Sequence, residues 1–370
     1  MIDLPPLSEL NLNDLETSAV LRAVVSAGRT LAELKGAVAS IPNEGILISA
    51  LGRQEAKDSS AIENIITTHD DLFRSAVGDE ALSASAKKVR DYAKALRVGY
   101  DRVRAKGPIT NNLLIELQAI LERNTAGFRR LPGTSLKEST TGRIVYTPPQ
   151  EHDVIIALMT DLEVFINVPT HASVNSPIDP LVRMAIAHHR FESIHPFYDG
   201  NGRTGRILNV LFLVQHGLLD IPVRYLSRYI VQHKTEYYRL LQQVRDTAQW
   251  EPWLLYMLQA VEETARGTLQ TIARIKTVLF RYKNHIRDHL PFYSQDLINS
   301  LFLHPYTRID YFMADIGVSR PTAQRYLARL VEEKLLVSKR VGRSHYYINV
   351  GLTEVLLDVE GVASDTTDAA

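Results

Sequence analysis

The feature that most constrains the fold is a helical spacing of apolar residues that repeats along most of the first 290 residues. Between residues 17 and 35, for example, Val20, Leu21, Val24, Val25 and Leu31 follow the three-and-four spacing that places side chains on one helix face. Similar stretches predict helices at residues 43–55, 59–67, 83–104, 111–124, 154–167, 180–192, 203–217, 235–244, 250–265 and 262–287. Because each apolar face must be covered by another element, we expect a mainly α-helical fold.

Two segments depart from this pattern. Residues 126–150 are rich in Gly, Thr and Pro, and their one β-like run, at residues 143–147, predicts a short hairpin or flap. Residues 300–350 predict helices at 307–316 and 319–334 with a turn at Gly317, followed by two strands around residues 341–343. Ser319 can cap the second helix, and Pro321 is tolerated in its first turn. This order of elements is typical of a winged helix.

Composition excludes several functional classes. Lys+Arg and Asp+Glu are both 42, so the formal net charge is zero and no overall basic excess points to nucleic acid. The sequence contains no Cys, which excludes disulfides, thiolate metal sites and Cys nucleophiles. The N-terminus does not resemble a secretory signal, and no run of about 18 apolar residues is present. We therefore expect a cytoplasmic protein that has no membrane span.

The most informative stretch is HPFYDGNGRTGR, at residues 195–206. Gly200 and Gly202 lie in a flexible loop just before a helix, so backbone N–H groups and the positive end of the helix dipole can face an anion. Arg203 and Arg206 are three residues apart and can lie on one side of the helix start. Because arginine binds phosphate through two parallel hydrogen bonds, this segment predicts a phosphate site.

Two further groups complete the parts that phosphate chemistry needs. A carboxylate at Asp199, directly before the anion loop, makes sense if it holds a Mg²⁺ ion that bridges phosphate oxygens. His195 is the nearest group that can take up a proton near neutral pH. A base, a metal ligand, an anion loop and two arginines within twelve residues predict a phosphoryl or nucleotidyl transferase.

The same string matches the signature of a known family. HPFYDGNGRTGR agrees with HPFx[DE]GNGRxxR at every specified position, and the chain resembles the Fic family from near its N-terminus to about residue 260. The resemblance implies a Mg²⁺-dependent transfer of AMP from ATP to Ser, Thr or Tyr hydroxyls of proteins (AMPylation), including self-modification. In this reaction His195 would deprotonate the target hydroxyl, which attacks the α-phosphate, and Asp199 would hold Mg²⁺.

The resemblance also implies which residues meet ATP. The anion loop and Arg203 would cradle the α- and β-phosphates, and Arg206 would fix the γ-phosphate. For Ser193 a purely structural role is an equal alternative, and only one of two adjacent helical tyrosines is expected to reach adenine or ribose. Phe197 is expected in the core, anchoring the loop. The expected ATP site comprises Glu63, Ser193, Gly200, Asn201, Gly202, Arg203, Thr204, Gly205, Arg206, Tyr237 and Tyr238.

A second motif lies upstream. The six residues from Ser59 through Glu63 to Asn64 match the inhibitory-helix pattern [ST]xxxE[GN] of Fic proteins, on the helix expected near residues 59–67. A carboxylate at Glu63 that reaches Arg206 would occupy the partner of the γ-phosphate through a charge-assisted ion pair. ATP would then bind with its α-phosphate misaligned, which inhibits transfer. The alternative is that Glu63 is an ordinary exposed helix residue.

The hairpin at residues 140–148 is expected to lie over the site as a flap. Its strand could hold the target segment by main-chain hydrogen bonds, and Gly142, Arg143, Ile144 and Val145 would border the nucleotide. Because main-chain pairing requires no particular sequence, the target protein is not revealed. The alternative is a plain surface hairpin.

These observations divide the chain into five parts: an N-terminal helical region with the inhibitory helix (1–106), a Fic core (107–265), a helical connector (266–299), a winged-helix domain (300–350) and a polar tail (351–370). On the second helix of the winged-helix domain, Arg320, Arg325 and Arg329 would suit DNA, but Glu332 and Glu333 dilute their charge. We favour a protein contact or a homodimer over DNA for this domain.

Two other functions stay open at this stage. The same residues would serve the reverse direction, so the chain could remove AMP from modified proteins, with Glu63 aligning a water molecule. Alternatively, it could be a DNA-binding regulator whose Fic core only senses nucleotide.

Overall fold

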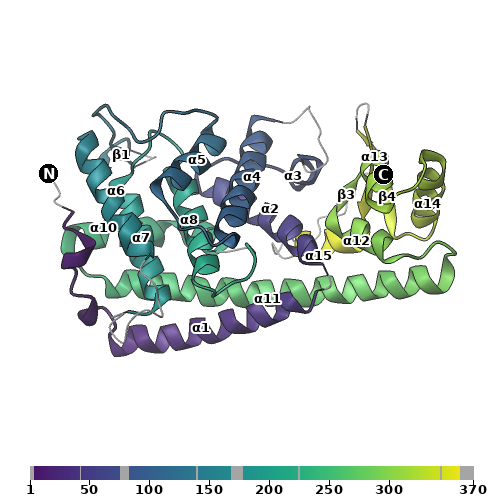
Figure 1. Cartoon of the computed structure of the whole chain (residues 1–370), viewed down its shortest axis with the longest axis horizontal. Coiled ribbons are helices and arrows are strands. Elements are labelled where there is room, and N and C mark those ends of the chain that lie inside the picture. The colour runs from purple at the N-terminus through teal and green to yellow at the C-terminus, as the bar shows by residue number, and fades with distance from the viewer. Residues whose placement is uncertain are drawn as a thin grey trace.

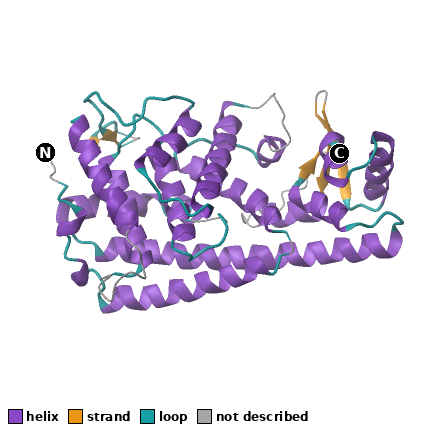
Figure 2. Ribbon diagram, in the orientation of Figure 1, coloured by secondary structure: helices purple, strands orange, loops and turns teal. Residues whose placement is uncertain are grey.

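The structure of this chain is a computed structural model, which describes residues 4–41, 43–75, 83–138, 141–167, 178–223, 226–341 and 344–358. As the sequence predicts, regular structure in these ranges is mainly helical, with two small sheets (Figure 2). The helices before residue 290 are η1 (Leu7–Glu9), η2 (Leu12–Asp14), α1 (Ser18–Ala39), α2 (Glu44–Ile62), α3 (His69–Ser75), α4 (Ala84–Arg104), α5 (Asn111–Glu122), α6 (His152–Asn167), α7 (Pro180–Ile194), α8 (Asn201–Gln215), α9 (Ser227–Gln232), α10 (Lys234–Thr247) and α11 (Glu251–His289).

Two long helices, α1 and α11, lie side by side along one edge of the molecule (Figure 1). Two overlapping helices were expected at residues 250–265 and 262–287, but α11 is continuous over 39 residues. It is unbroken because its one proline, Pro252, stands in the first turn, where a missing N–H does no harm. The domain boundary expected at residues 265–266 lies inside this helix and stays a prediction. No described helix, α11 included, has the apolar stretch needed to cross a membrane.

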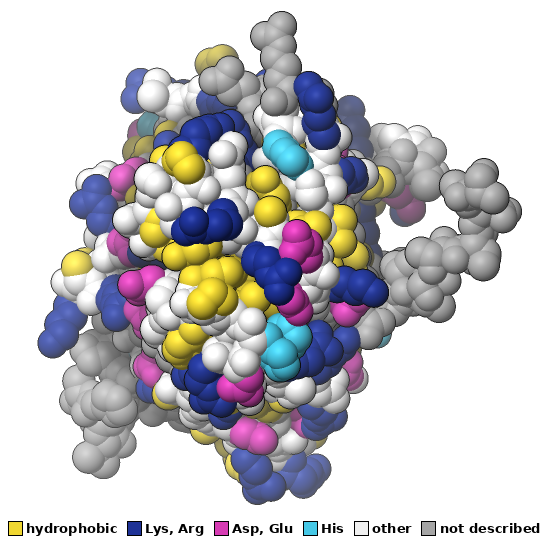
Figure 3. Space-filling view, turned by 90° about the vertical axis from the view of Figure 1, so that its right-hand side faces the viewer, with side chains coloured by type: hydrophobic (Ala, Val, Ile, Leu, Met, Phe, Trp, Pro, Cys, Tyr) yellow, Lys and Arg dark blue, Asp and Glu magenta, His cyan; other side chains and the backbone are white. Residues whose placement is uncertain are grey.

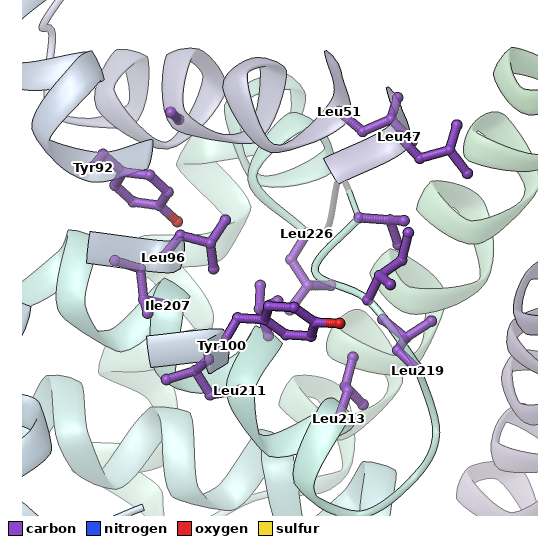
Figure 4. Close-up of a cluster of buried hydrophobic side chains, with 14 of the residues drawn as sticks. Leu47, Leu51, Tyr92, Leu96, Tyr100, Ile207, Leu211, Leu213, Leu219 and Leu226 are labelled. Atoms are coloured by element: carbon purple, nitrogen blue, oxygen red, sulfur yellow. The ribbon is translucent and has the colours of Figure 1, made fainter. Parts of the chain in front are cut away.

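The centre of the molecule is formed by α7 and α8, which pack against each other and against α4, α5 and α6. Helix α7 begins with Pro180 at its first position and with the Asp179 carboxylate accepting a hydrogen bond from the Leu181 amide (2.8 Å). Every residue from Leu181 to Ile194 is buried, so α7 is a core helix. Figure 4 shows part of the core, where α2, α4 and α8 contribute Leu47, Leu51, Tyr92, Leu96, Tyr100, Ile207, Leu211 and Leu213.

Helix α2 corrects the prediction of separate helices at residues 43–55 and 59–67, including the expected inhibitory helix. It is a single helix that ends at Ile62. The stop is a Schellman turn: Asn64 adopts a left-handed φ of 60°, its amide donates to the Ala61 carbonyl (3.0 Å), and the amide of Ile65 donates to the Ser60 carbonyl (3.0 Å). The segment after Ile62 therefore leaves the helix, and Glu63 is its C-cap residue.

The predicted flap is present as a short hairpin. Strand β2 (Ile144–Tyr146) pairs antiparallel with β1 (Leu136–Lys137), with Lys137 opposite Ile144. Residues 139 and 140 lie outside the described residues, and Gly142 takes a φ of 70°, which glycine adopts without strain.

The C-terminal domain follows α11. Its elements are α12 (Gln295–Leu303), β3 (Tyr306–Thr307), α13 (Ile309–Ile316), α14 (Arg320–Glu332), β4 (Leu336–Val341), β5 (Ser344–Asn349) and α15 (Val350–Asp358), with sheet order β3-β5-β4. The two predicted helices and two predicted strands are thus present, while the finer winged-helix assignment stays a prediction. Gly317 ends α13 with a φ of 66°. Ser319 occupies the N-cap position of α14, but its hydroxyl donates to the Thr322 hydroxyl (3.1 Å) and accepts no capping hydrogen bond from the backbone of that helix.

The polar tail expected at residues 351–370 is wrong in its first part, because α15 covers residues up to Asp358. Leu352, Val355 and Leu356 of α15 are buried, so this short apolar stretch belongs to the core. The rest of the expected tail lies outside the described residues.

Candidate active site

His195 lies at the point where α7 ends. It is the C-cap residue, with a left-handed φ of 49°, and its amide donates to the Phe191 carbonyl (2.9 Å). A fully buried arginine, Arg129, fixes this turn: its Nε donates to the His195 carbonyl (2.8 Å) and its backbone amide to the Pro196 carbonyl (2.8 Å). Sequence reasoning missed Arg129, because nothing in the local pattern links residue 129 to residue 195.

The electrostatic surroundings of His195 keep its imidazole neutral. Burial, followed by the positive charges of Arg245 and Arg129, lowers its pKa to about 4. The imidazole is therefore uncharged at neutral pH, which is the form that can accept a proton. Its Nδ1 is buried and has no hydrogen-bond partner among the described residues.

The loop after His195 is held by its own side chains. Asn201 accepts from the Phe197 amide (2.8 Å) and donates to the Phe197 carbonyl (2.8 Å), and Phe197 is in the core as expected. Thr204 donates its hydroxyl to the carbonyl of Gly200, which takes a φ of 80°. Because the Asn201 side chain is engaged with the loop, Asn201 can meet an anion only through its backbone amide, whereas the hydroxyl and the amide of Thr204 both donate to the Gly200 carbonyl.

Gly205 has a packing reason for lacking a side chain. A Cβ there would come within 2.8 Å of Oε1 of Glu192 and 3.0 Å of the Phe191 ring on α7. Burial raises the pKa of Glu192 to about 7, although the charges of Arg206 and Arg245 oppose this shift. Gly205 therefore allows α7 and α8 to approach closely.

Arg203 and Arg206 converge on Glu63. Both arginine side chains are almost fully buried; Nε of Arg203 donates to Oε2 of Glu63 (2.6 Å), and an Nη of Arg206 donates to Oε1 (2.9 Å). A Cβ on Gly202 would lie 2.8 Å from that Oε1, so the glycine gives Glu63 room. Burial alone would lower the pKa of Arg206, but the Glu63 carboxylate raises it above its usual value. One carboxylate thus bridges two buried guanidinium groups.

The other two specified residues of the upstream motif, Ser59 and Asn64, also contribute to this arrangement. Ser59 accepts from Nε of Arg206 through its hydroxyl (2.7 Å) and from an Nη through its carbonyl (2.9 Å). Asn64 supplies the left-handed residue of the turn that directs Glu63 away from the helix, a conformation that Gly and Asn adopt most readily. Glu63, exposed to 24% at its side chain, is therefore not an ordinary surface residue.

A second carboxylate was missed by sequence reasoning. Glu122, at the end of α5, pairs with an Nη of Arg203, whose Nε pairs with Glu63, and it packs against Gly200. Burial raises the pKa of Glu122, the Arg203 charge lowers it, and the Asp199 charge raises it again. Only the tertiary fold brings α5 to this place, so no spacing in the sequence could have identified it.

Ser193 links the flap to the loop. Its hydroxyl accepts from Nε of Arg245 (3.0 Å), and its carbonyl accepts from the Tyr146 hydroxyl of β2 (2.8 Å). The Arg245 guanidinium lies over the Tyr146 ring at 3.9 Å from its centre. These contacts favour the structural alternative for Ser193.

The other predicted residues divide into buried and exposed ones. Tyr237 is buried, with its hydroxyl 2.8 Å from Nε2 of His188, whereas Tyr238 is 48% exposed. In the flap, the residues expected beside the nucleotide are all exposed: Gly142, Arg143, Ile144 and Val145. Across the described part of the chain, no group of three His, Asp or Glu side chains that could hold a metal ion is present.

Comparisons with known proteins agree with the resemblance to the Fic family. The Fic/DOC family N-terminal model matches residues 21–101, the Fic/DOC family model matches residues 108–213, and a model described as the C-terminal domain of SoFic-like protein adenylyltransferases matches residues 279–352. A probable protein adenylyltransferase of Aquifex aeolicus is 51% identical over 53 residues, which cover 14% of this chain and 17% of that protein. Protein adenylyltransferase fic-1 of Caenorhabditis elegans is 35% identical over 97 residues, covering 25% and 18% respectively. The chain therefore spans less than a fifth of these curated relatives.

Solved structures have the same fold. A Fic family protein from Desulfovibrio desulfuricans G20 superposes with a TM-score of 0.55 at 21% identity, covering 90% of this chain and 96% of that one. Fic-1 from Caenorhabditis elegans superposes with a TM-score of 0.51 at 21% identity, covering 68% and 74%.

Proposed function

We propose that this chain, which belongs to the Fic/DOC family, transfers AMP from ATP to a hydroxyl side chain of a protein. One observation carries the proposal: beside the neutral His195, a carboxylate of the chain itself binds Arg203 and Arg206 at the start of α8. Two buried guanidinium groups at a helix N-terminus are suited to the phosphates of a nucleotide, and Glu63 takes the place of an anionic ligand.

His195 acts as the general base. The target hydroxyl gives its proton to the imidazole while its oxygen attacks the α-phosphorus, and the bond to the leaving pyrophosphate breaks. The lowered pKa of His195 supports this role because the imidazole is uncharged at neutral pH. Arg129 donates to the carbonyls of Ile194 (3.2 Å) and His195 (2.8 Å), and the Asn201 side chain holds the backbone of Phe197, so the base is positioned in advance.

Glu63 inhibits the reaction by competing for the phosphate ligands. Its carboxylate engages Arg206, the expected partner of the γ-phosphate, and also Arg203, the expected partner of the α- and β-phosphates. ATP that binds beside an intact Glu63 cannot use both arginines, so its α-phosphate does not face the incoming hydroxyl. Removal of the carboxylate returns both arginines to the nucleotide.

Asp199 fits the Mg²⁺ that the family implies. Its carboxylate is 67% exposed, Oδ1 accepts from the Gly200 amide (2.7 Å), and Oδ2 makes no hydrogen bond or ion pair within the described ranges. Gln118 of α5 donates to the Asp199 carbonyl (3.2 Å) and fixes its backbone. Asp199 would hold Mg²⁺ through its carboxylate, and the ion would supply positive charge that offsets the charge of the phosphates.

The exposure of individual side chains indicates which residues border the adenosine of ATP and which bind the target segment. Tyr238 is the member of the tyrosine pair that can border adenine or ribose, because Tyr237 is buried against His188. The target segment adds as a strand to β2, which pairs only with β1 among the described strands and exposes Ile144 and Val145.

The charge of the C-terminal domain supports a protein contact over DNA. On α14, Arg320 pairs with Asp310 (2.8 Å), and Arg329 pairs with both Glu332 (2.6 Å) and Glu333 (3.1 Å). Figure 3, which views this end of the molecule, shows Lys and Arg scattered among acidic and hydrophobic side chains. Arginines that are already neutralised offer little to a phosphate backbone.

The test is incubation of cell lysate with α-³²P-ATP and Mg²⁺, comparing wild type, Glu63→Gly and the double variant Glu63→Gly/His195→Ala. We expect labelled protein bands that are stronger with Glu63→Gly and absent with the double variant. The double variant should unfold at the same temperature as Glu63→Gly, which shows that its fold is intact. Unchanged labelling without His195 would remove it from the mechanism. Release of AMP from labelled protein by wild type, lost in Glu63→Gly, would favour the reverse reaction.

A further inference from the structure

Helix α2 is held from two sides. Toward the core, Leu47 and Leu51 pack with α4 and α8 (Figure 4), and Glu55 receives hydrogen bonds from the hydroxyls of Tyr92 (3.5 Å) and Ser227. The C-terminal domain also contacts α2. Its helix α12 packs against α2, and its helix α15 accepts a hydrogen bond from it (Figure 1).

Two hydrogen bonds attach α2 to that domain. The Ser49 hydroxyl donates to the carbonyl of Leu303, the last residue of α12 (2.8 Å). Nε2 of Gln54, which is buried, donates to the carbonyl of Leu356 in α15 (2.7 Å). Gln54 lies nine residues before Glu63, and the continuous helix α2 connects the two. A shift of α15 would therefore be transmitted along α2 to Glu63.

The same domain also binds the chain after Glu63. The Tyr306 hydroxyl of β3 and the Lys339 ammonium of β4 each donate to Oδ1 of Asp70 in α3 (3.2 Å each). The Phe73 ring of α3 stacks on the Tyr306 ring, with centres 5.4 Å apart. Glu63 thus lies in a segment whose two ends, α2 and α3, are both attached to the C-terminal domain.

We propose that the C-terminal domain is a clamp that holds Glu63 in its inhibitory position, and that loosening this domain from α2 and α3 activates the enzyme. This inference rests on the proposed function, because it assumes that Glu63 inhibits transfer. The inhibited state is one of two states in equilibrium, and each contact made only in that state favours it. The contacts of Ser49, Gln54, Asp70 and Phe73 would break when the domain loosens from α2 and α3, which makes them contacts of this kind.

The test uses the full-length chain with Lys339→Glu and, separately, Tyr306→Leu. The matched control is Arg325→Glu, which makes the same charge change in the same domain on the exposed side of α14, where no contact with α2 or α3 occurs in the described structure. Each variant is made with Glu63 present and with Glu63→Gly. AMP incorporation and hydrogen–deuterium exchange of residues 44–63 are measured for all of them.

We expect Lys339→Glu and Tyr306→Leu to accelerate exchange in α2 and to raise AMP incorporation at least threefold, but only where Glu63 is present. In the Glu63→Gly background they should change incorporation less than twofold, and Arg325→Glu should have no effect in either. Faster exchange without faster transfer, or unchanged exchange, would overturn the clamp. If Glu63→Gly alone is no faster than wild type, the inhibitory role itself fails, which separates the two failures.

Discussion

Two substitutions of Glu63 separate the contribution of its charge to inhibition from the contribution of its shape. Glu63→Gly removes the carboxylate and its stem, whereas Glu63→Gln keeps the shape and replaces the charged acceptor by a neutral one. In the structure this carboxylate accepts from Arg203 (2.6 Å) and Arg206 (2.9 Å), both buried. We expect AMP transfer to rise in the order wild type, Glu63→Gln, Glu63→Gly.

The magnitude follows from these two hydrogen bonds. A hydrogen bond to a charged group contributes about 1.5–3 kcal/mol. Because the Glu63 side chain is 24% exposed, we take the low end, which gives about 3 kcal/mol for the pair. That is roughly a hundredfold in rate for Glu63→Gly. Glutamine keeps one acceptor oxygen and places an NH2 donor where the second oxygen was, so only one of the two arginines keeps an acceptor and roughly tenfold is expected for Glu63→Gln.

The assay is initial-rate AMP incorporation at saturating ATP, with calorimetric ATP binding alongside. Glu116→Gln, which removes a partly exposed carboxylate paired with Arg102, is the matched control and should leave the rate unchanged. If wild type and Glu63→Gln had equal rates while Glu63→Gly was fast, the size of the side chain at position 63 would be the cause of inhibition, and its charge would not. A Glu63→Gly protein no faster than wild type would refute the reasoning altogether.

Three further predictions concern neighbouring groups. Glu122→Gln, in the Glu63→Gly background, should lower kcat/KM for ATP roughly tenfold without changing the melting temperature, because Arg203 then loses the nearer of its two remaining carboxylates and keeps only Asp199 at 4.0 Å; a uniform loss of stability would contradict a positioning role. His195 should stay neutral down to about pH 5, since its pKa lies at about 4; histidine ¹⁵N NMR that shows titration near pH 6.5 would contradict this. Glu192, whose pKa is raised from 4.5 to about 7, binds its proton more tightly in the folded state, so stability should fall as pH rises between these values, by up to about 3 kcal/mol. Glu192→Gln should remove that slope in urea unfolding, and an unchanged slope would exclude Glu192 as its cause.

The sequence of residues 195–206 could indicate a candidate phosphate site because its signal is local. A loop before a helix, two arginines three residues apart and a histidine nearby predict an anion site without knowledge of the tertiary fold. The helices were predictable for the same reason, since their apolar spacing is a property of neighbouring residues.

What could not be predicted depends on distant segments. Three side chains reach the site from distant segments: Glu122 from α5, Arg129 from the loop after α5, and Arg245 from α10. No local spacing in the sequence indicates that these segments pack around α7 and α8. The end of α2 was misplaced because the Schellman turn at Asn64 is set by a backbone conformation that the helical pattern does not reveal. Helix α15 was missed because its apolar run is too short to stand out, although burial of Leu352 and Leu356 makes it part of the core.

AMP transfer is the central claim, and the position of the label in ATP tests it most directly. Purified Glu63→Gly protein and an acceptor identified from the lysate are incubated with Mg²⁺ and ATP labelled either at the α- or at the γ-phosphate. The account predicts that the α-label enters the acceptor, that the γ-label leaves as pyrophosphate, and that His195→Ala abolishes incorporation. Incorporation of the γ-label would mean phosphoryl transfer, and incorporation of neither would contradict the proposed activity.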